Sequence, residues 1–397
     1  MAAETQARTP LTQSVQAPRA SVFEAFTTAT RLCEWFSYDA QLEAAPGGRF
    51  YAYWREPGFY AVGEYLEVRA PELIRLRWSD KDNPQPVEVE IAFAESEGAT
   101  EVSVHHPAMP AALEPLWRRA LAALASTQER GYHLDLLERP MLGVLLGGDV
   151  TAENAGQYGV PVAYGAALQG TLAGLSAEAA GLRQGDVIVG MDGKEVRSVQ
   201  DIPPITRGHK AGDTVVVEFY RGAERHAVPM ELRPRNLHPY PESLEDLARA
   251  MAREKQRLIG ELRALLADAT DAEAERAPAP GKWNAKQILA HLVASERESQ
   301  AFIASLAVGN ELEVFTANLD ARVNALVRRY PTLATLAQAL EDAYAETLEI
   351  VRGLPQDFLA RKVGVVRVQL AAEADPFHVR HHLGQARRAL EAARQAA

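Results

Sequence analysis

Cysteine, basic charge and long apolar runs are all scarce in this chain of 397 residues. The one cysteine, Cys33, excludes an intrachain disulfide and fits a reducing compartment. The longest apolar candidate, 141–148, falls far short of the roughly 20 residues that a membrane-spanning helix needs. A net charge of −11 without a long basic run argues against nucleic acid and anionic membranes as partners. Residues 1–13 lack the apolar core of a signal peptide, so we expect a cytoplasmic protein.

The composition is that of a globular protein, with 47% apolar and 24% charged residues. A chain of this length is too long for one ordinary hydrophobic core, because domains usually run to about 100–150 residues. Shifts in composition along the chain predict three domains, at 1–138, 139–235 and 236–397.

The first domain alternates signals for strands and helices. A strand is predicted at 11–17, and the helix that follows Pro18 carries apolar residues at helical spacing. Successive strands are then predicted at 50–54, 62–68, 73–78, 87–93 and 101–105. A long amphipathic helix is predicted at 111–130, and the antiparallel sheet should curve around it.

This domain contains a series of short motifs, namely Ala17-Pro18, Val22-Phe23, Ala25-Phe26, Trp35, Pro46-Gly47-Gly48-Arg49-Phe50, Gly63 and Trp78. Together they resemble the START-like (SRPBCC) superfamily, in the branch of homologues of the activator of the heat-shock chaperone ATPase. The resemblance implies an α+β helix-grip fold whose cavity takes a small apolar ligand. The side chains that could line this cavity, or simply fill the core, are Trp35, Phe36, Tyr51, Tyr53, Trp54 and Trp78. Of His105 and His106, adjacent on one strand, at most one can face the cavity.

The second domain is rich in glycine and in short strands, predicted at 187–191, 214–220 and 226–232. Its segment 176–188, SAEAAGLRQGDVI, resembles PDZ domains of the bacterial HtrA type, which implies a mostly-β PDZ fold. The segment 139–144, RPMLGV, resembles the loop whose backbone N–H groups bind the terminal carboxylate of a peptide. The peptide-binding residues implied by this resemblance are Met141, Leu142, Gly143 and Val144.

Pro203 and Pro204 depart from the PDZ pattern, because they fall in the helix that walls the peptide groove. Proline should shorten or break that helix. Two interpretations therefore stay open: the domain binds a peptide C-terminus by strand addition, or it serves as a spacer or docking surface between its neighbours.

Four amphipathic helices are predicted beyond a linker at 236–243, which is typical of an all-α four-helix bundle. The first spans 244–268. The second starts after Asn284, which can cap it in a capping box with Gln287. The third spans 333–351. The fourth is predicted to begin at Asp375-Pro376, an N-cap followed by proline at the first helical position, and to end near 394.

Three histidines of this bundle are candidate metal ligands. His378 and His382 are four residues apart on one predicted helix, so their imidazoles share a face. His291 occupies an inward position on the second helix. Two histidines at this spacing suit one metal ion, although the same spacing is also common on exposed helices. His381 could replace His382 as a ligand, but it lies on a different face.

The segments 283–292 and 375–385 resemble the two histidine motifs of DinB-like proteins. In that family these histidines bind a divalent metal, usually zinc or nickel. The resemblance implies His291, His378 and His382 as ligands, with His381 as a non-ligand neighbour and Gln385 behind the ligands. Asn284 stands where the family usually has Ser or Thr, and it can cap the helix equally well.

Two classes of function follow. In the first, the protein is a binding or adaptor protein with a small-ligand cup, a PDZ docking module and a structural metal. In the second, it is an enzyme, a metal-dependent transferase or hydrolase that could use a low-molecular-weight thiol, as some DinB-like relatives do. The sequence specifies no general base; Glu296, five residues after His291, is a candidate. A homodimer is left open, as are the ligand and the metal.

Overall fold

The computed structural model describes residues 10–55, 58–107, 109, 113–172, 174–235, 237, 239–309 and 316–395. The chain forms two compact units, one made by residues 1–131 and 239–397 and the other by 132–238. The predicted fold class is confirmed: a curled antiparallel sheet with helices, a sheet-rich middle region and an all-helical C-terminal region follow one another. None of the described helices is both long and apolar enough to cross a membrane.

The first domain is built on an antiparallel sheet of seven strands in the order β1-β7-β6-β5-β4-β3-β2. The strands are β1 (Leu11–Val15), β2 (Asp39–Leu42), β3 (Arg49–Trp54), β4 (Phe59–Arg69), β5 (Leu73–Asp80), β6 (Val87–Ser96) and β7 (Ala99–His105). From β2 to β7, each strand pairs with its sequence neighbours. The first strand instead pairs with the last, with Leu11 opposite Val104 and Val15 opposite Thr100.

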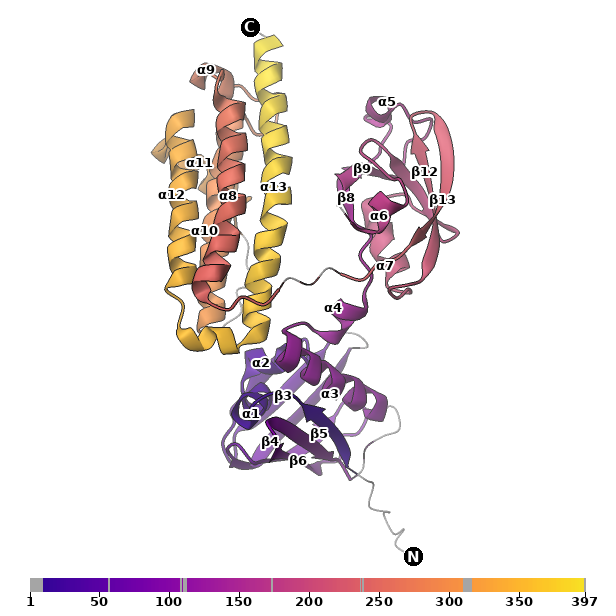
Figure 1. Cartoon of the computed structure of the whole chain (residues 1–397), viewed down its shortest axis with the longest axis vertical. Coiled ribbons are helices and arrows are strands. Elements are labelled where there is room, and N and C mark those ends of the chain that lie inside the picture. The colour runs from indigo at the N-terminus through magenta and orange to yellow at the C-terminus, as the bar shows by residue number, and fades with distance from the viewer. Residues whose placement is uncertain are drawn as a thin grey trace, which may run out of the picture. The chain divides into compact units, whose positions relative to one another are not determined.

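Three helices accompany this sheet, namely α1 (Arg19–Thr27), α2 (Ala29–Cys33) and α3 (Leu113–Arg130). Figure 1 shows the long helix α3 lying across the sheet. Its apolar stripe is buried through Trp117, Leu121 and Leu124, at the spacing that one helix face requires. The core of the domain therefore lies between α3 and one face of the sheet.

The middle unit contains a second antiparallel sheet, in the order β13-β12-β10-β9-β8, with β11 paired to β10. Its strands are β8 (Val144–Asp149), β9 (Ala166–Thr171), β10 (Val187–Met191), β11 (Lys194–Glu195), β12 (Thr214–Arg221) and β13 (Glu224–Glu231). Its helices are α4 (Leu134–Glu138), α5 (Ala155–Tyr158), α6 (Ser176–Ala179) and α7 (Ile202–Thr206), with a 3₁₀ turn at Val199–Asp201. Strand β8 lies at one edge of this sheet.

The C-terminal region is a helical bundle, and Figure 1 shows its long helices side by side. They are α8 (Leu244–Leu266), α10 (Ala285–Ala307), α12 (Leu333–Arg352) and α13 (Lys362–Gln395). Shorter elements are α9 (Asp271–Ala274), α11 (Asp320–Arg329) and the 3₁₀ helix Gln356–Ala360. The predicted start of α10 is confirmed, because Asn284 and Gln287 form the expected capping box.

The predicted start of the fourth bundle helix is wrong. Helix α13 begins at Lys362, and Pro376 lies in its interior. Proline there removes one helical hydrogen bond, which leaves the carbonyl of Ala372 without its usual donor. The helix continues because packing compensates on both sides of the proline: Val368 before it and Val379 after it are buried in the bundle. Asp375 is therefore an interior helical residue and not an N-cap.

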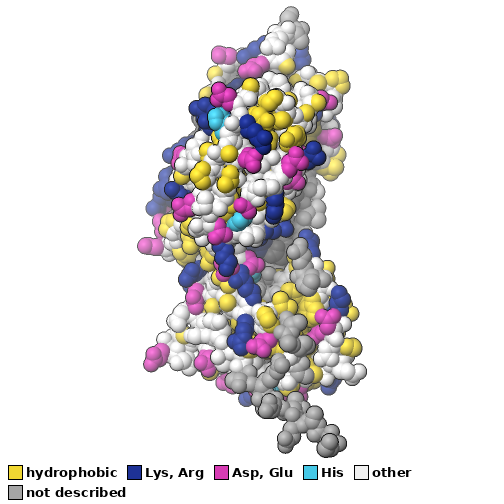
Figure 2. Space-filling model, turned by 90° about the vertical axis from the view of Figure 1, so that its right-hand side faces the viewer, with side chains coloured by type: hydrophobic (Ala, Val, Ile, Leu, Met, Phe, Trp, Pro, Cys, Tyr) yellow, Lys and Arg dark blue, Asp and Glu magenta, His cyan; other side chains and the backbone are white. Residues whose placement is uncertain are grey.

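Surface charge is mixed in sign, in agreement with the composition. On the face drawn in Figure 2, Lys and Arg side chains are interspersed with Asp and Glu. In the bundle, for example, Arg380 donates to Glu254 and to Glu261. Such pairs on a surface contribute little to stability, typically about 0–1 kcal/mol each, but they keep the surface hydrated.

Candidate metal centre

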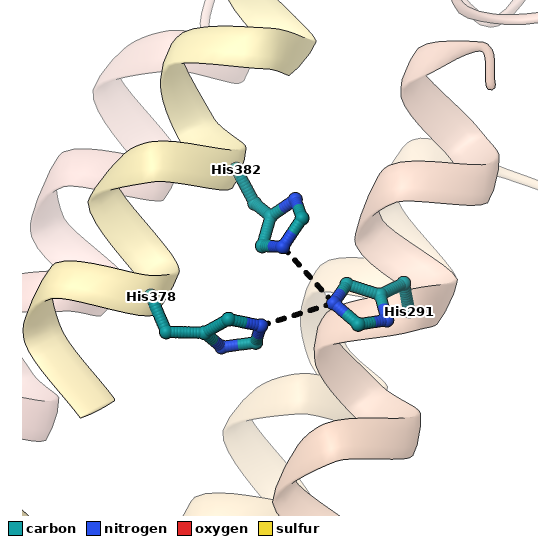
Figure 3. Close-up of side chains that lie close together, drawn as sticks. All are labelled: His291, His378 and His382. Atoms are coloured by element: carbon teal, nitrogen blue, oxygen red, sulfur yellow. Dashed lines mark hydrogen bonds between the residues drawn. The ribbon is translucent and has the colours of Figure 1, made fainter. Parts of the chain in front are cut away.

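The three predicted histidines come together in the core of the bundle. His291 is on α10, and His378 and His382 are one turn apart on α13 (Figure 3). The Nε2 atom of His291 lies 3.0 Å from Nε2 of His378 and 3.0 Å from Nε2 of His382. Three imidazoles that are far apart in sequence thus present their Nε2 atoms to one point.

Hydrogen bonds on the far side of two rings decide which nitrogen carries the proton. Nδ1 of His291 lies 3.2 Å from the carbonyl oxygen of Ala317, and Nδ1 of His382 lies 2.9 Å from Oε1 of Gln385. Carbonyl and amide oxygens can only accept, so each Nδ1 carries a hydrogen. In the neutral rings, the Nε2 atoms of His291 and His382 therefore both present lone pairs, and they do so across 3.0 Å.

Two facing lone pairs repel each other unless a proton or a cation lies between them. Four-coordinate zinc with Zn–N bonds of about 2.0–2.1 Å places its ligand nitrogens roughly 3.3 Å apart. The ligand atoms of these three histidines all lie within 4.8 Å of one another, so small side-chain adjustments suffice for a cation. The donor set, three neutral imidazoles, is one that zinc, nickel and copper accept.

Burial lowers the pKa of all three imidazoles, because each ring is at least partly withdrawn from water, which disfavours the charged form. For His382 the pKa falls to about 3, first through burial and then through the neighbouring rings of His291 and His378. The three histidines are therefore neutral near pH 7, which is the protonation state that a metal ligand requires.

The lowered pKa values predict how the stability of the metal-free protein depends on pH. The unfolded chain takes up protons on these histidines below about pH 6.5, whereas the folded chain resists protonation. Stability should therefore fall as pH drops from about 6.5 toward 3. Thermal unfolding of chelator-treated protein measures this loss. A His378→Ala, His382→Ala double variant serves as the control, since carboxylates titrate in both proteins. If both proteins lose stability equally, these histidines do not have the lowered pKa values.

The edge of the middle unit carries the loop predicted to bind a peptide. Gly143 has φ = +72°, and a Cβ atom there would lie 2.4 Å from Cβ of Leu175. Two hydrogen bonds fix the loop through its carbonyl groups. Ser176 Oγ donates to the carbonyl of Met141, and the N–H of Ala177 donates to the carbonyl of Leu142. Within the described ranges, the N–H groups of Leu142 and Gly143 have no hydrogen-bond acceptor.

The aromatic side chains of the first domain mostly fill its core. Trp35, Phe36 and Trp78 surround a cavity of only about 10 Å³, roughly one water molecule. Tyr51 and Tyr53 alternate along β3 with the buried Phe50 and Ala52, so they lie on the opposite face of the sheet. Trp54 donates to the carbonyl of Phe36 outside the cavity lining, and His106 is buried while His105 is partly exposed.

Comparisons with known proteins cover all three regions. The sequence profile of the activator of Hsp90 ATPase homolog 1-like proteins matches residues 16–129, that of the PDZ domain matches 173–232, and that of the DinB superfamily matches 255–386. Their order along the chain is the predicted one. The chain joins an Hsp90-activator-like domain, a PDZ domain and a DinB-superfamily domain.

Curated relatives match about a quarter of the chain. A probable periplasmic serine endoprotease, DegP-like, from Marinomonas is 31% identical over 112 residues, which are 28% of this chain and 24% of the relative. A probable periplasmic serine protease, do/HhoA-like, from Haemophilus influenzae is 30% identical over 116 residues, 28% of this chain and 25% of the relative. The chain thus spans about a quarter of the length of these relatives.

Solved structures also match part of the chain. An HSP90 activator from Plasmodium falciparum is 26% identical, covers 26% of this chain and 73% of its own, and has a TM-score of 0.23. The Aha1 dimer from Colwellia psychrerythraea is 13% identical, covers 30% of this chain and 93% of its own, and has a TM-score of 0.27.

In the PDZ domain, the predicted effect of the two prolines is visible. Helix α7 has only five residues, with Pro203 and Pro204 in its first turn. Its apolar residues Ile202 and Ile205 are buried in the core of the domain. The helix predicted to wall a peptide groove is thus short, and β8 lies at the edge of the sheet.

In the DinB domain, the structure adds residues that sequence reasoning missed. Ala317, whose carbonyl orients His291, follows Thr316, and the hydroxyl of Thr316 donates to Glu298 over 2.9 Å. Arg322 also donates to Glu298, over 2.7 Å. The hydrogen bond from His291 to Ala317 could not be predicted from the sequence. The segment around Ala317 has no regular periodicity, and a backbone carbonyl is present at every residue, so its role leaves no mark in the sequence.

Two other predictions about this domain have clear outcomes in the geometry. Nε2 of His381 accepts from Gln385 at 2.9 Å and lies outside the three-histidine cluster. Glu296 is buried and contacts Lys255 at 2.7 Å, so its carboxylate is engaged away from the three imidazoles. The proposal of Glu296 as a general base finds no support in this arrangement.

Proposed function

We propose that this chain is a binding protein whose DinB domain holds one divalent cation and whose PDZ domain docks the C-terminus of another polypeptide. The observation that carries the proposal is the pair of lone pairs on His291 and His382, held 3.0 Å apart by hydrogen bonds behind each ring. A proton or a cation between the two lone pairs would relieve their repulsion, and the lowered pKa of His382 disfavours the proton.

The residues that would hold the cation are His291, His378 and His382, through their Nε2 atoms. When bound, such a cation would tie α10 to α13 and could act as a Lewis acid at a remaining coordination position. The chain's own contribution is to keep the imidazoles neutral and oriented. Burial keeps them neutral, and Ala317 and Gln385 orient two of the rings by accepting hydrogen bonds from the Nδ1–H groups of His291 and His382.

Metal content tests this proposal. The freshly purified protein, dialysed against metal-free buffer, should contain about one zinc or nickel ion per chain by elemental mass spectrometry. A protein that neither contains such an ion nor takes one up on titration would make the bundle a purely structural or interaction module.

Peptide docking is supported by the two N–H groups of Leu142 and Gly143 beside the edge strand β8. A peptide with a free apolar C-terminus should bind at least about tenfold more tightly than the same peptide with an amidated end, because charge-assisted hydrogen bonds contribute about 1.5–3 kcal/mol. Fluorescence anisotropy with a C-terminal peptide library measures this difference. Equal affinity for the free and the amidated peptide would contradict carboxylate binding and favour the interpretation of the domain as a spacer.

An enzymatic role is the second candidate, because three protein ligands leave a coordination position for a thiol or water. Absorption spectroscopy of the cobalt-loaded protein during titration with a low-molecular-weight thiol tests it. A sulfur-to-cobalt band would support the thiol-dependent class, and its absence would favour a structural cation.

Small-ligand binding by the first domain and a cytoplasmic location stay predictions. The cavity lined by Trp35, Phe36 and Trp78 has room for about one water molecule, so a larger ligand at that place would require the lining side chains to move. Fractionation of expressing cells would test the location, since the single Cys33 fits a reducing compartment.

A further inference from the structure

A layer of polar residues crosses the core of the bundle and divides it in two. One apolar cluster contains Leu258, Leu289 and Val379, and the other contains Met251, Ile303 and Val368. Between them lie Lys255 on α8, Glu296 on α10, Thr347 on α12 and Asp375 on α13, which we call the ionic layer. All four long helices contribute to it.

The contacts within the ionic layer are close and largely shielded from water. Nζ of Lys255 lies 2.7 Å from Oε1 of Glu296 and 3.5 Å from Oδ2 of Asp375. The Thr347 hydroxyl donates to Glu296, and the Lys255 ammonium lies 3.9 Å from the centre of the Tyr344 ring. Glu296 is 2% exposed and Lys255 is 7% exposed. One ammonium thus faces two carboxyl groups; burial raises the pKa of Glu296, and the side chain of Asp375 is 22% exposed.

One carboxylate of the ionic layer, Asp375, lies close to the histidines. Asp375 precedes His378 by three residues on α13, so the two side chains project from one face of the helix on adjacent turns. Another carboxylate near the site, Glu298, is paired with Arg322 at 2.7 Å, and this guanidinium offsets its charge. Within the described ranges, the ionic layer is thus a source of negative charge close to the three neutral imidazoles, through Asp375.

A divalent cation on three neutral imidazoles brings two positive charges into the bundle core. Burying such charge is costly unless an opposite charge lies near, because the interior screens poorly. We infer that the ionic layer sets the affinity of the three-histidine site for a divalent cation, with Asp375 as the positioning residue through which its negative charge acts. The inference rests on the proposed cation site and deepens it.

A purely structural role for the layer would have another signature. Buried polar layers can also fix the register of packed helices, and then substitutions would change folding without changing cation affinity. The two roles are separable because the layer contains a charged set and an uncharged member, Thr347, on the same hydrogen-bonded carboxylate.

The experiment measures the dissociation constant for Zn²⁺ by chelator competition in the full-length protein, with circular dichroism to verify folding. Asp375→Asn and Glu296→Gln, nearly isosteric changes, should each weaken Zn²⁺ binding by about tenfold, the lower end of what outer-shell changes cause. The double variant should weaken it further. Asp375→Glu should restore most of the affinity, and Thr347→Val should leave it within about twofold of wild type.

Three outcomes would overturn the inference. If the wild-type chain binds Zn²⁺ and both carboxylate variants bind it equally well, the layer has no electrostatic role. If Thr347→Val weakens binding as much as Asp375→Asn, the layer acts through structure alone. If the wild-type chain itself binds no Zn²⁺, the proposed cation site fails, and the inference falls with it.

Discussion

Replacing His378 by alanine is expected to reduce the metal content from about one ion per chain to less than about a tenth. The remaining imidazoles, His291 and His382, offer two ligands instead of three, which is too few for a stable site of the tetrahedral type. The fold should persist, because His378 is only partly buried and the apolar core around it is supplied by other residues. Elemental analysis of the purified variant measures the effect.

His381 provides the matched control for this variant. It is adjacent to His382 on the same helix, but its ring bonds to Gln385 outside the cluster. His381→Ala should therefore keep about one ion per chain. Full metal content in His378→Ala, or a loss in His381→Ala equal to that in His378→Ala, would remove the ligand assignment.

Replacing Arg221 by methionine is expected to destabilise the PDZ domain by about 3–5 kcal/mol, the usual cost of leaving a buried charge without its partner. Asp186 is fully buried, and its two carboxylate oxygens each lie 2.8 Å from a guanidinium nitrogen of Arg221. The backbone N–H of Arg183 also donates to this carboxylate, which therefore cannot turn toward water.

Hydrogen exchange of the amides of β10 in the full-length chain reports on this loss, because the domain need not unfold together with the rest of the protein. An Asp186→Asn, Arg221→Met double variant should recover part of the stability, since no buried charge is then unpaired. A loss below about 1 kcal/mol in Arg221→Met would show that water reaches the carboxylate.

Much of the fold could be predicted because local signals agree with tertiary packing. The capping box of Asn284 and Gln287 fixes the start of α10 in the sequence and in the structure alike. Asp375-Pro376 shows where such signals fail. The same dipeptide suits a helix start and a helix interior, and the choice between them depends on packing against α8 and α10, which no local pattern contains.

The candidate site also has a part that the sequence predicts and a part that it does not. The spacing of His378 and His382 predicts a shared helix face, and the structure places them with His291 in one cluster. The groups that orient the imidazoles, and those that bring negative charge near them, could not be predicted from residue spacing. The carbonyl of Ala317 comes from an irregular segment, and the ionic layer combines residues from four helices whose alignment only the assembled bundle determines.

The pairing of β1 with β7 has a consequence for synthesis on the ribosome. Strand β1 ends at Val15, but its partner is complete only when His105 has been made, about 90 residues later. At typical translation rates of about 5–20 residues per second, the first strand waits roughly 5–20 s for its neighbour. During that time its backbone N–H and C=O groups are unpaired within the sheet, so the nascent chain exposes a strand edge that chaperones, or a neighbouring nascent chain, can occupy.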